Sequence, residues 1–312
     1  MAGRATAKTE LFSHWRGGAM VIADEGMSTG GRLWVHSGTG AATTGYGLAP
    51  HKPISTLNGA VALATASKAD VIYLMPGHAE TISSAALSPT ISKIGVRVVG
   101  LGRGALRPTF SLTHVDATIA VSAASVSLEN VRILAGVSAV KIGVTVTAAD
   151  FEMKDCEMYW GGTTGWDFIV GVNLATANRA TFDNCRFLAE PAVAGAASGI
   201  KLVGANDNVR IRRCEFMGDY SVACVNGITV LSQGLMFLDN LVHNTDAGEP
   251  YLEVLTGTTG VIANTRGLAS GATIAANAVA DAMAHCENFV ANTTGTIAII
   301  KGAGGSPALD AD

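Results

Sequence analysis

Short apolar segments recur through the middle of the chain, and a polar pair interrupts each one at the same point. Aligned on that point, four segments match clearly, and they are SLENVRIL (127–134), EMKDCEMY (152–159), TFDNCRFL (181–188) and RIRRCEFM (210–217). Two weaker copies follow, MFLDNLVH (236–243) and GVIANTRG (260–267). The reference residues are spaced by 25, 29, 29, 26 and 24 positions, and they are Val131, Cys156, Cys185, Cys214, Asn240 and Asn264. A repeat of this length indicates a stacked solenoid.

Apolar residues alternate with polar ones on both sides of the reference position. Three positions before it stand Leu128, Met153, Phe182, Ile211, Phe237 and Val261. Two positions after it stand Ile133, Met158, Phe187, Phe216 and Val242. A period of two predicts two short strands that meet at a bend, with like residues of successive turns stacked about 4.8 Å apart. We therefore predict an all-β fold, a right-handed single-stranded parallel β-helix that is a pectate-lyase-like solenoid.

The two ends of the chain differ from this repeat. STLNGAVALATAS (55–67) has a modest apolar face and predicts a short helix, capped by Ser55 or Thr56, that covers the open end of the solenoid. The basic and aromatic residues of the first 18 positions form either a frayed tail or an arm that becomes ordered on binding another protein; they are Arg4, Lys8, Phe12, Trp15 and Arg16. We divide the chain into an arm (1–30), an N-terminal cap with the short helix (31–68), a parallel β-helix (69–268) and a C-terminal cap or oligomer contact (269–312).

Two columns of charged residues lie beside the reference position and alternate in sign. One column holds Arg132, Glu157, Arg186 and Glu215, and the other holds Glu129, Lys154, Asp183 and Arg212. Stacking would pair opposite charges across neighbouring strands, each pair contributing about 0.2–1 kcal/mol. A slip by one turn would bring like charges together. The alternative is a ligand groove or a catalytic carboxylate pair, but each acid already has a cation beside it, so we favour structural ladders.

The composition narrows the class of protein further. Of the 312 residues, 48% are hydrophobic and 15% are charged, and there are 37 glycines. Disordered chains are poor in apolar residues, and no apolar run reaches the ~20 residues of a membrane span. The net charge of −4 provides no general basis for binding nucleic acid, so we expect neither a nucleic-acid nor a membrane partner. The first residues lack the apolar core of a secretion signal, and we expect synthesis in the cytoplasm.

The residues that usually carry chemistry do not gather in the sequence. The five cysteines contain no CxxC motif, and Cys156, Cys185 and Cys214 share one inward column, where a packing role is favoured over a metal-binding or reactive trio. No histidine pair has the spacing of metal ligands, and the acids outside the two ladders stand singly, such as Asp150, Asp167, Asp219 and Asp246. GLGRG (100–104) lacks the spacing of a dinucleotide fingerprint and marks a turn. We expect no enzyme activity, no metal and no cofactor.

One stretch carries a family resemblance. WVHSGTGAATTGYGLAPHKPISTLNGAVALATASKADVIYLMPGHAETI (34–82) resembles the opening of tailed-phage right-handed parallel β-helix virion proteins of the capsid decoration (cement) or spike type. The matching elements are a Gly-rich turn, then Lys52, Pro53, Thr56 and Leu57, then a strand that ends in Met75, Pro76, Gly77, His78, Ala79 and Glu80. VVGLGRGALRPTF (98–110) and VSAASVSLENVRIL (121–134) follow in the same order, and the resemblance covers residues 31–268. We interpret MPGHAE as a turn, with a catalytic His78–Glu80 pair as the alternative.

The resemblance implies a phage structural protein located on the capsid exterior. The leading hypothesis is a homotrimeric capsid decoration or cement protein that binds the phage major capsid protein and stabilises the head shell. In this hypothesis the N-terminal arm is the candidate anchor to the capsid. The alternative is a tail spike or fibre that binds, or also depolymerises, host surface polysaccharide. A bacterial surface adhesin is a third class, which the missing signal disfavours. The resemblance supplies no catalytic residues.

Overall fold

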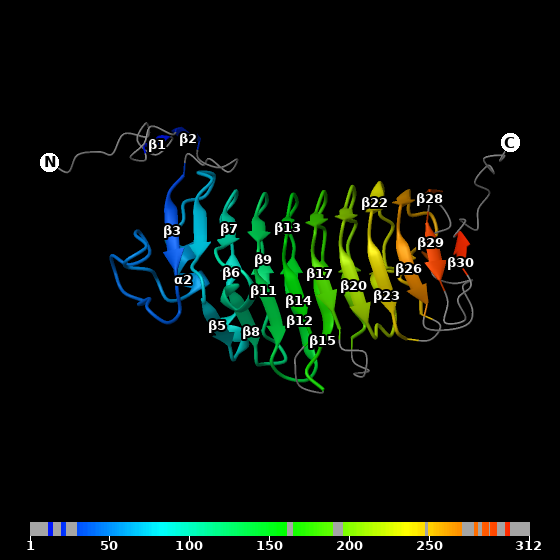
Figure 1. The fold of residues 1–312 in the computed structure, drawn as a ribbon, viewed down its shortest axis with the longest axis horizontal. Helices are drawn as coiled ribbons and strands as arrows, with labels where there is room; N and C mark the ends of the chain where they lie inside the picture. The colour runs from blue at the N-terminus through cyan, green and yellow to red at the C-terminus, as the bar shows by residue number, and fades with distance from the viewer. Residues whose placement is uncertain are drawn as a thin grey trace.

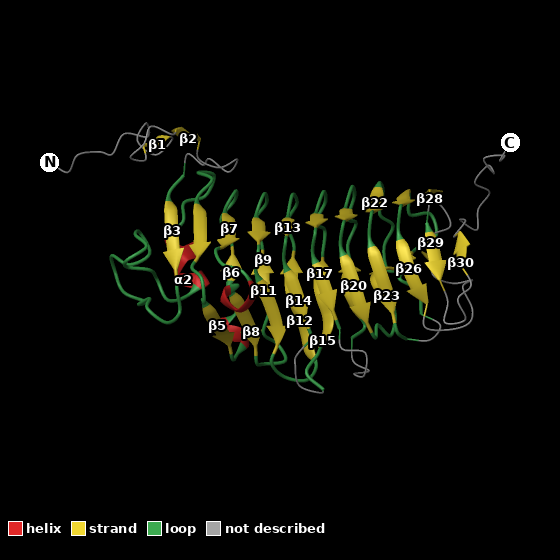
Figure 2. Ribbon diagram, viewed as in Figure 1, coloured by secondary structure: helices red, strands yellow, loops and turns green. Residues whose placement is uncertain are grey.

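The computed structural model describes residues 12–14, 20–22, 30–160, 165–189, 196–246, 249–269, 278–279, 283–286, 288–291 and 297–299. In this part of the chain almost all regular structure is β-strand, and the strands of successive turns lie side by side along the long axis of the molecule (Figure 1). Helical segments occur only toward the N-terminal end of the described solenoid (Figure 2). They are the α-helix α2 (Leu57–Leu63) and the 3-10 helices η1 (Ala85–Leu87) and η2 (Gly104–Leu106).

Three sheets form the walls of the solenoid. The first contains β3 (Arg32–Val35), β4 (Val71–Leu74), β7 (Arg97–Gly100), β10 (Ser127–Glu129), β13 (Glu152–Lys154), β16 (Thr181–Asp183), β19 (Arg210–Arg212), β22 (Leu235–Leu238), β25 (Gly260–Ala263) and β28 (Met283–Cys286). The second contains β5 (Ala79–Ile82), β8 (Thr109–Leu112), β11 (Arg132–Ala135), β14 (Glu157–Tyr159), β17 (Arg186–Leu188), β20 (Glu215–Gly218), β23 (Leu241–Asn244), β26 (Arg266–Ala269), β29 (Phe289–Ala291) and β30 (Ile297–Ile299). The third contains β6 (Thr90–Ile91), β9 (Ile119–Val121), β12 (Val140–Val146), β15 (Phe168–Leu174), β18 (Ser198–Leu202), β21 (Ala223–Gly227), β24 (Leu252–Val254) and β27 (Ala278–Val279).

The chain visits the three sheets in turn, and each strand pairs in parallel with the strand of the next turn. Two antiparallel pairs lie outside this pattern, β29 with β30 and the separate hairpin of β1 (Phe12–His14) and β2 (Met20–Ile22). The parallel β-helix predicted from the sequence is therefore confirmed. The sheets reach beyond residues 69–268, because β3 lies in the segment assigned to the cap and β28 and β29 lie in the segment assigned to the C-terminal cap.

Helix α2 covers one end of this solenoid, as the apolar face of residues 55–67 predicts. Its N-cap is Thr56, whose Oγ1 accepts a hydrogen bond from the Gly59 N–H at 3.2 Å. Leu57 and Val61 are buried, and the helix packs against β3, β4 and β6. The helix thus shields apolar residues at this end of the described stack, where no further turn of the described chain covers them.

The polar pair that recurs in each repeat lies at the corner between the first and second sheets. One residue of each corner adopts a positive φ of 48–55°, and these residues are Asn130, Asp155, Asn184, Arg213, Asp239 and Asn264. Asn and Asp tolerate this left-handed conformation better than most residues. The predicted alignment of the last repeat is wrong by one position, because β23 pairs Leu241 with Arg266 and Thr265 is therefore the equivalent of Asn240. Ile262, not Val261, therefore faces the core, and Val261 is 37% exposed.

Large side chains from successive turns fill the interior. Met153, Phe182 and Ile211 of the first sheet are buried and in register, as predicted. The rings of Phe187 and Phe216 in the second sheet stack with centroids 4.7 Å apart and planes 4° from parallel. The ring centroid of Phe237 lies 6.3 Å from that of Phe216 and 5.9 Å from that of Tyr251, so the aromatic packing extends across several turns. This packed interior leaves the outer faces of the sheets and the corners to carry function.

Candidate functional site

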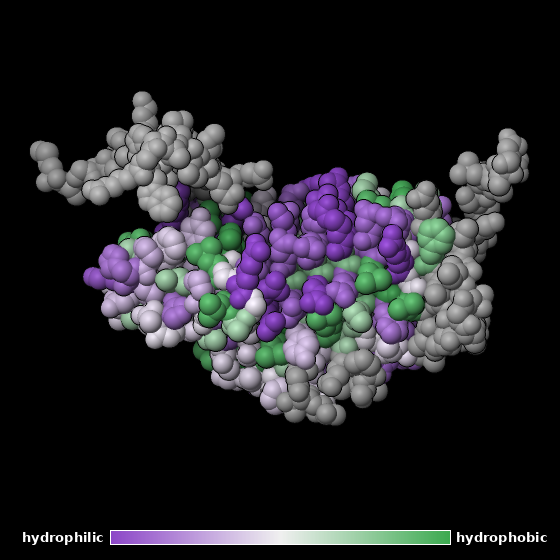
Figure 3. All heavy atoms as spheres, viewed as in Figure 1, coloured by the Kyte–Doolittle hydropathy of each residue, from purple (hydrophilic) through white to green (hydrophobic). Residues whose placement is uncertain are grey.

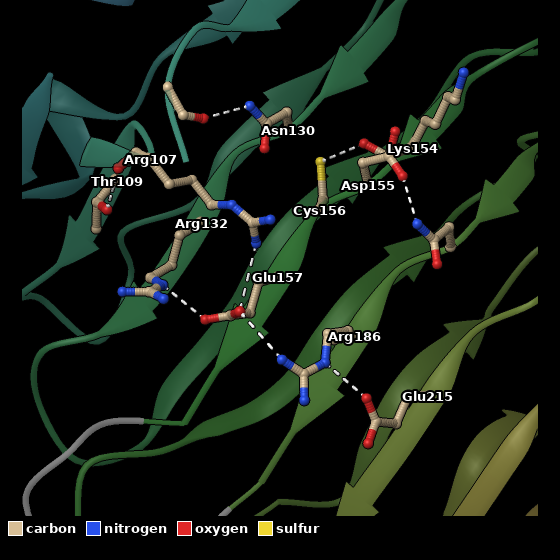
Figure 4. Close-up of polar contacts among 12 residues, drawn as sticks. Arg107, Thr109, Asn130, Arg132, Lys154, Asp155, Cys156, Glu157, Arg186 and Glu215 are labelled. Carbon is tan, nitrogen blue, oxygen red and sulfur yellow. Dashed lines mark hydrogen bonds and ion pairs between the residues drawn. The ribbon is translucent and has the colours of Figure 1, made fainter. Parts of the chain in front are cut away.

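A pocket opens on the outer surface at the corner between the first and second sheets. Its volume is about 430 Å³. It is lined by Arg103, Arg107, Asn130, Asp155, Cys156, Asn184 and Arg186. The lining residues come from three consecutive corners and from the loop between β7 and β8. Figure 4 shows most of these side chains gathered over the corner. The pocket therefore exists only because turns that are distant in sequence are stacked.

The loop that carries Arg103 and Arg107 is held tightly. Gly102 has a φ of +117°, and a Cβ at that position would lie 2.5 Å from the Leu106 carbonyl oxygen, so only glycine fits. The Asn130 Nδ2 donates hydrogen bonds to the carbonyl oxygens of Gly100 (2.7 Å) and Gly102 (2.8 Å). The glycines of GLGRG thus shape a turn, as predicted, and the same turn presents two arginines at the rim of the pocket.

Glu157 lies below the pocket and contacts three arginines (Figure 4). Its carboxylate oxygens lie 2.7 Å from Arg132 Nε, 3.4 Å from Arg107 Nη1 and 3.8 Å from Arg186 Nη1. The side chain of Glu157 is only 9% exposed, so these contacts compensate a carboxylate that is largely removed from water. Because Glu157 is occupied in this way, it is poorly placed to act as a general base.

The first predicted charge column lies in register on the second sheet. Arg132 is opposite Glu157, Glu157 opposite Arg186, and Arg186 opposite Glu215. Arg186 Nε donates to Glu215 Oε2 at 2.6 Å, and this hydrogen bond raises the pKa of Arg186 above its ordinary value. An alternating series of ion pairs therefore runs across four strands, as the column geometry predicts.

The second predicted column is also in register, but its ion pairs differ from the expected ones. Lys154 is exposed and forms no ion pair within the described part of the chain, although it lies opposite both Glu129 and Asp183. Glu129 instead accepts from Arg97 on β7 at 2.8 Å, and this hydrogen bond raises the pKa of Arg97. Asp183 is bound by Arg212 (2.9 Å) and by its neighbour Arg213 (2.5 Å). The ammonium of Lys154 is strongly hydrated and lacks the planar fork of a guanidinium, so it remains in solvent where arginines satisfy both acids.

The three stacked cysteines are buried behind the same corner. The Cys156 Sγ lies 3.3 Å from the Leu128 carbonyl oxygen of the preceding turn, and the Cys185 Sγ lies 3.2 Å from that of Met153. Burial raises the pKa of the Cys156 thiol to about 12, and burial also raises that of Cys185. A thiol with a raised pKa is a poor nucleophile and a poor metal ligand. These observations fit a packing role with a weak hydrogen bond to the neighbouring turn.

Native alkylation should therefore distinguish one cysteine from the other four. Cys286 is exposed, whereas Cys156, Cys185, Cys214 and Cys224 are buried. We expect iodoacetamide at pH 8 to modify Cys286 within minutes and the other four only after unfolding, because a buried thiol is protonated and inaccessible. Peptide mass spectrometry of the native and denatured protein measures this difference. Rapid native labelling of Cys185 would contradict the buried column.

His78 and Glu80 join the cap to the solenoid. The side chain of His78 is fully buried, its Nδ1 accepts from the Ser37 N–H at 3.1 Å, and its Nε2 lies 3.3 Å from Glu80 Oε2. Glu80 Oε2 accepts from the N–H of Leu57, the first residue of α2, at 2.9 Å. A substrate cannot reach this pair, so the arrangement favours the structural interpretation of MPGHAE over the catalytic one.

The remaining residues show little organised chemistry. Within the described ranges, no group of three His, Cys, Asp or Glu side chains could hold a metal ion, and no helix is long and apolar enough to span a membrane. Asp219 and Asp246, which stand singly in the sequence, lie close enough to interact, since burial and the Asp246 charge raise the pKa of Asp219. Among the predicted anchor residues, Arg4, Lys8, Trp15 and Arg16 lie outside the described residues, and Phe12 begins β1.

Comparison with known proteins identifies a fold but no family. No protein-family model and no curated protein sequence matches the chain. The structure is similar to that of a rhamnogalacturonan lyase, with a TM-score of 0.51 and 13% sequence identity over 78% of this chain and 75% of that chain. A second alignment, with Geobacillus virus E2 ORF18, has a TM-score of 0.38 and 9% identity over 75% of this chain and 57% of that chain. The first similarity supports the parallel β-solenoid fold alone.

The pocket was not predicted from the sequence. In the sequence, Arg186 is recognisable only as a member of a charge column. Arg103 lies in the GLGRG turn and Arg107 lies three residues after it, with no sign that either lines a pocket. The signal that could have revealed it is the corner column itself, where Asn130, Asp155 and Asn184 precede the reference residues at the same relative position. Polar side chains that recur at one corner must stack in space, and a neighbouring arginine-bearing loop then converges on them.

Proposed function

We propose that this protein is a structural protein of a bacteriophage virion, a homotrimer that decorates the exterior of the capsid and stabilises the head shell by binding the major capsid protein. The resemblance of residues 34–82 to phage β-helix virion proteins supplies the class. The observation that supports the proposed trimer is a pair of exposed apolar stripes on different faces of the solenoid. We expect neither catalysis nor a cofactor.

The first stripe, called here the second-sheet stripe, consists of Leu188, Met217, Leu241 and Leu268. Three of these side chains are markedly exposed, with residue exposures of 39% for Met217, 45% for Leu241 and 49% for Leu268. They lie on the outer faces of consecutive strands of the second sheet, β17, β20, β23 and β26. Leu188, Met217 and Leu268 share one row of the strand register, which also holds His243, and Leu241 lies two residues before His243 on the same face. Figure 3 shows apolar surface over this region, bordered by a band of polar surface.

The second stripe, called here the third-sheet stripe, consists of Val203, Ile228 and Leu255. Each residue directly follows a strand of the third sheet, β18, β21 or β24, and the strand register places the three side by side. Their exposures are 38%, 41% and 37%. The two stripes occupy the same turns of the solenoid, so a copy whose second-sheet stripe meets the third-sheet stripe of its neighbour keeps all axes parallel. A head-to-tail contact of this kind forms a cyclic trimer when each contact rotates the next copy by one third of a turn.

The assembly is tested by the mass of the particle in solution. We expect multi-angle light scattering of the full chain to give three times the chain mass of 31.8 kDa. Leu241→Glu and Ile228→Glu each place a charge in one stripe and should each shift the mass toward that of a monomer. Val261→Glu, at a comparably exposed site on the first sheet, is the control and should leave the mass unchanged. A monomeric wild-type protein at micromolar concentration would contradict the trimer.

The capsid contact is tested by deleting residues 1–18. We expect the full chain to cosediment with phage heads that lack it, and the truncated chain to remain in the supernatant while its trimer mass is retained. Retained cosedimentation would remove the arm from the contact. Immunogold labelling of the tail instead of the head would contradict the decoration role.

A tail spike or fibre that binds host polysaccharide is the second candidate function. The corner pocket favours it, because arginines and amides around a depression can bind an acidic sugar, whereas a passive cement protein has no need of such a pocket. A reducing-sugar assay on host capsule separates the two roles. Release of sugar would favour a depolymerising spike, and no release together with head labelling would favour the decoration role.

A further inference from the structure

We propose that the corner pocket lined by Arg103, Arg107, Asn130, Asp155, Asn184 and Arg186 binds a sugar acid, a saccharide unit that carries a carboxylate. This site goes beyond virion assembly, and it requires neither the head nor the tail location. Three properties of the pocket favour this ligand, and they are its excess of positive charge, its mixture of hydrogen-bonding groups and its size.

The guanidinium groups around the pocket exceed what its own acids can neutralise. Arg103 is exposed at the rim and forms no ion pair with the described residues. Arg107 makes only a 3.4 Å contact with Glu157, which Arg132 binds more closely at 2.7 Å, so the charge of Arg107 is weakly compensated. The pocket is therefore organised to accept an anion.

The polar groups beside the arginines indicate which kind of anion. Asp155 is part of the lining, and its Oδ1 accepts a hydrogen bond from the Asn184 Nδ2 at 2.6 Å. The Asp155 carboxylate repels a phosphate dianion more strongly than it repels the single charge of a sugar acid. It also accepts hydrogen bonds from sugar hydroxyls, as do the amide oxygens of asparagine. Arginine donates to a carboxylate in a bidentate geometry. The pocket thus offers donors for one carboxylate and, beside them, acceptors for several hydroxyls. This combination fits a sugar acid better than a phosphate.

The dimensions of the pocket and its surroundings agree with a saccharide. The volume of about 430 Å³ lies within the roughly 300–1,000 Å³ that is typical of small-molecule sites. Tyr159 follows Glu157 by two residues on β14, so its half-buried ring lies on the same outer face of the second sheet. That ring offers an apolar surface for a second sugar unit along the strand. A chain with at least one acidic unit can therefore extend from the pocket onto the sheet.

Calorimetric titration of the full chain tests the site. The probes are trigalacturonate and sialyllactose as sugar acids, maltotriose and lactose as neutral counterparts, and inorganic phosphate. We expect at least one sugar acid to bind and both neutral sugars to fail. Arg103→Gln should weaken the binding about tenfold or more, because a hydrogen bond to a charged group is lost. Arg210→Gln, which removes an exposed arginine from the outer face of β19, is the control and should leave the affinity unchanged.

Several results would overturn the proposal. These are no binding of either sugar acid, equal binding of maltotriose, tighter binding of phosphate than of the sugar acids, or equal weakening by Arg103→Gln and Arg210→Gln. Arg103 makes no ion pair in the described structure, so its substitution should preserve both the thermal unfolding midpoint and the mass in light scattering. A failure of this site is thus distinguishable from a failure of the assembly proposed above, which the stripe variants test separately.

Discussion

Replacing Phe216 with alanine is expected to lower the free energy of unfolding by about 3–5 kcal/mol, the range for removing a large aromatic side chain from a packed core. Phe216 is fully buried, stacks on Phe187 at 4.7 Å and contacts Phe237 at 6.3 Å. The backbone on every side is fixed by hydrogen bonds to neighbouring turns, so the walls of the cavity cannot easily collapse inward. Chemical denaturation followed by circular dichroism measures the loss.

Phe216→Leu is the matched control for this prediction. Leucine keeps most of the side-chain volume and all of the apolar character, so it should cost clearly less than alanine. Val261→Ala, which truncates a half-exposed side chain on the outer face of β25, should change the stability by less than about 0.5 kcal/mol. A Phe216→Ala variant as stable as Val261→Ala would mean that the aromatic contacts between turns do not support the solenoid.

Replacing Asn240 with leucine is expected to be almost as damaging, although leucine has a similar size and is apolar. The amide of Asn240 is buried, its Oδ1 accepts from the Cys214 N–H at 2.8 Å, and its Nδ2 donates to the Ile211 carbonyl oxygen at 3.0 Å. Leucine would leave the Cys214 N–H buried without a partner, at a cost of about 1–3 kcal/mol. It would also remove the second hydrogen bond that the Ile211 carbonyl oxygen accepts, worth about 0.5–1.5 kcal/mol, while the strand register keeps that oxygen paired with Leu238. We expect a total loss of about 1.5–4.5 kcal/mol, measured by the same denaturation experiment.

Asn173→Leu provides the comparison for Asn240→Leu. Asn173 lies on β15 at a half-buried outer position, so the same change of residue type leaves no buried backbone group without a hydrogen-bond partner there. Its effect should stay within about 0.5 kcal/mol. Equal losses for the two variants would show that the penalty arises from leucine itself and not from the two hydrogen bonds inside the corner.

The sequence revealed the fold because the solenoid repeats its own environment. Phe182, Ile211 and Phe237 must each fill the same interior position, so their apolar character recurs at the length of one turn. Arg132 and Glu157 reveal the register in a similar way, because opposite charges on adjacent strands attract. Both signals depend on neighbours that repeat, and neither requires knowledge of the exact side-chain conformation.

The repeat pattern does not predict features that depend on a single residue or on the conformation of one side chain. The aligned asparagines Asn240 and Asn264 are chemically alike, yet one lies inside the corner and the other adopts the positive φ, because the last copy is shifted by one position. Lys154 has the sign that the column requires but extends into solvent. The corner pocket could not be predicted from the sequence, because Arg103 belongs to a loop outside the repeat and no periodic pattern connects it to Asn184.

The regular strand register also has a mechanical consequence. Each parallel pairing joins residues one turn apart, such as Leu128 with Met153 and Met153 with Phe182, so the solenoid is held together by successive closures of 25 to 29 residues. A chain pulled from one end would peel away turn by turn, and each released turn would add about 80–105 Å of extended polypeptide. The molecule would therefore lengthen under load in discrete steps of nearly constant size, dissipating work a turn at a time before the last turn separates.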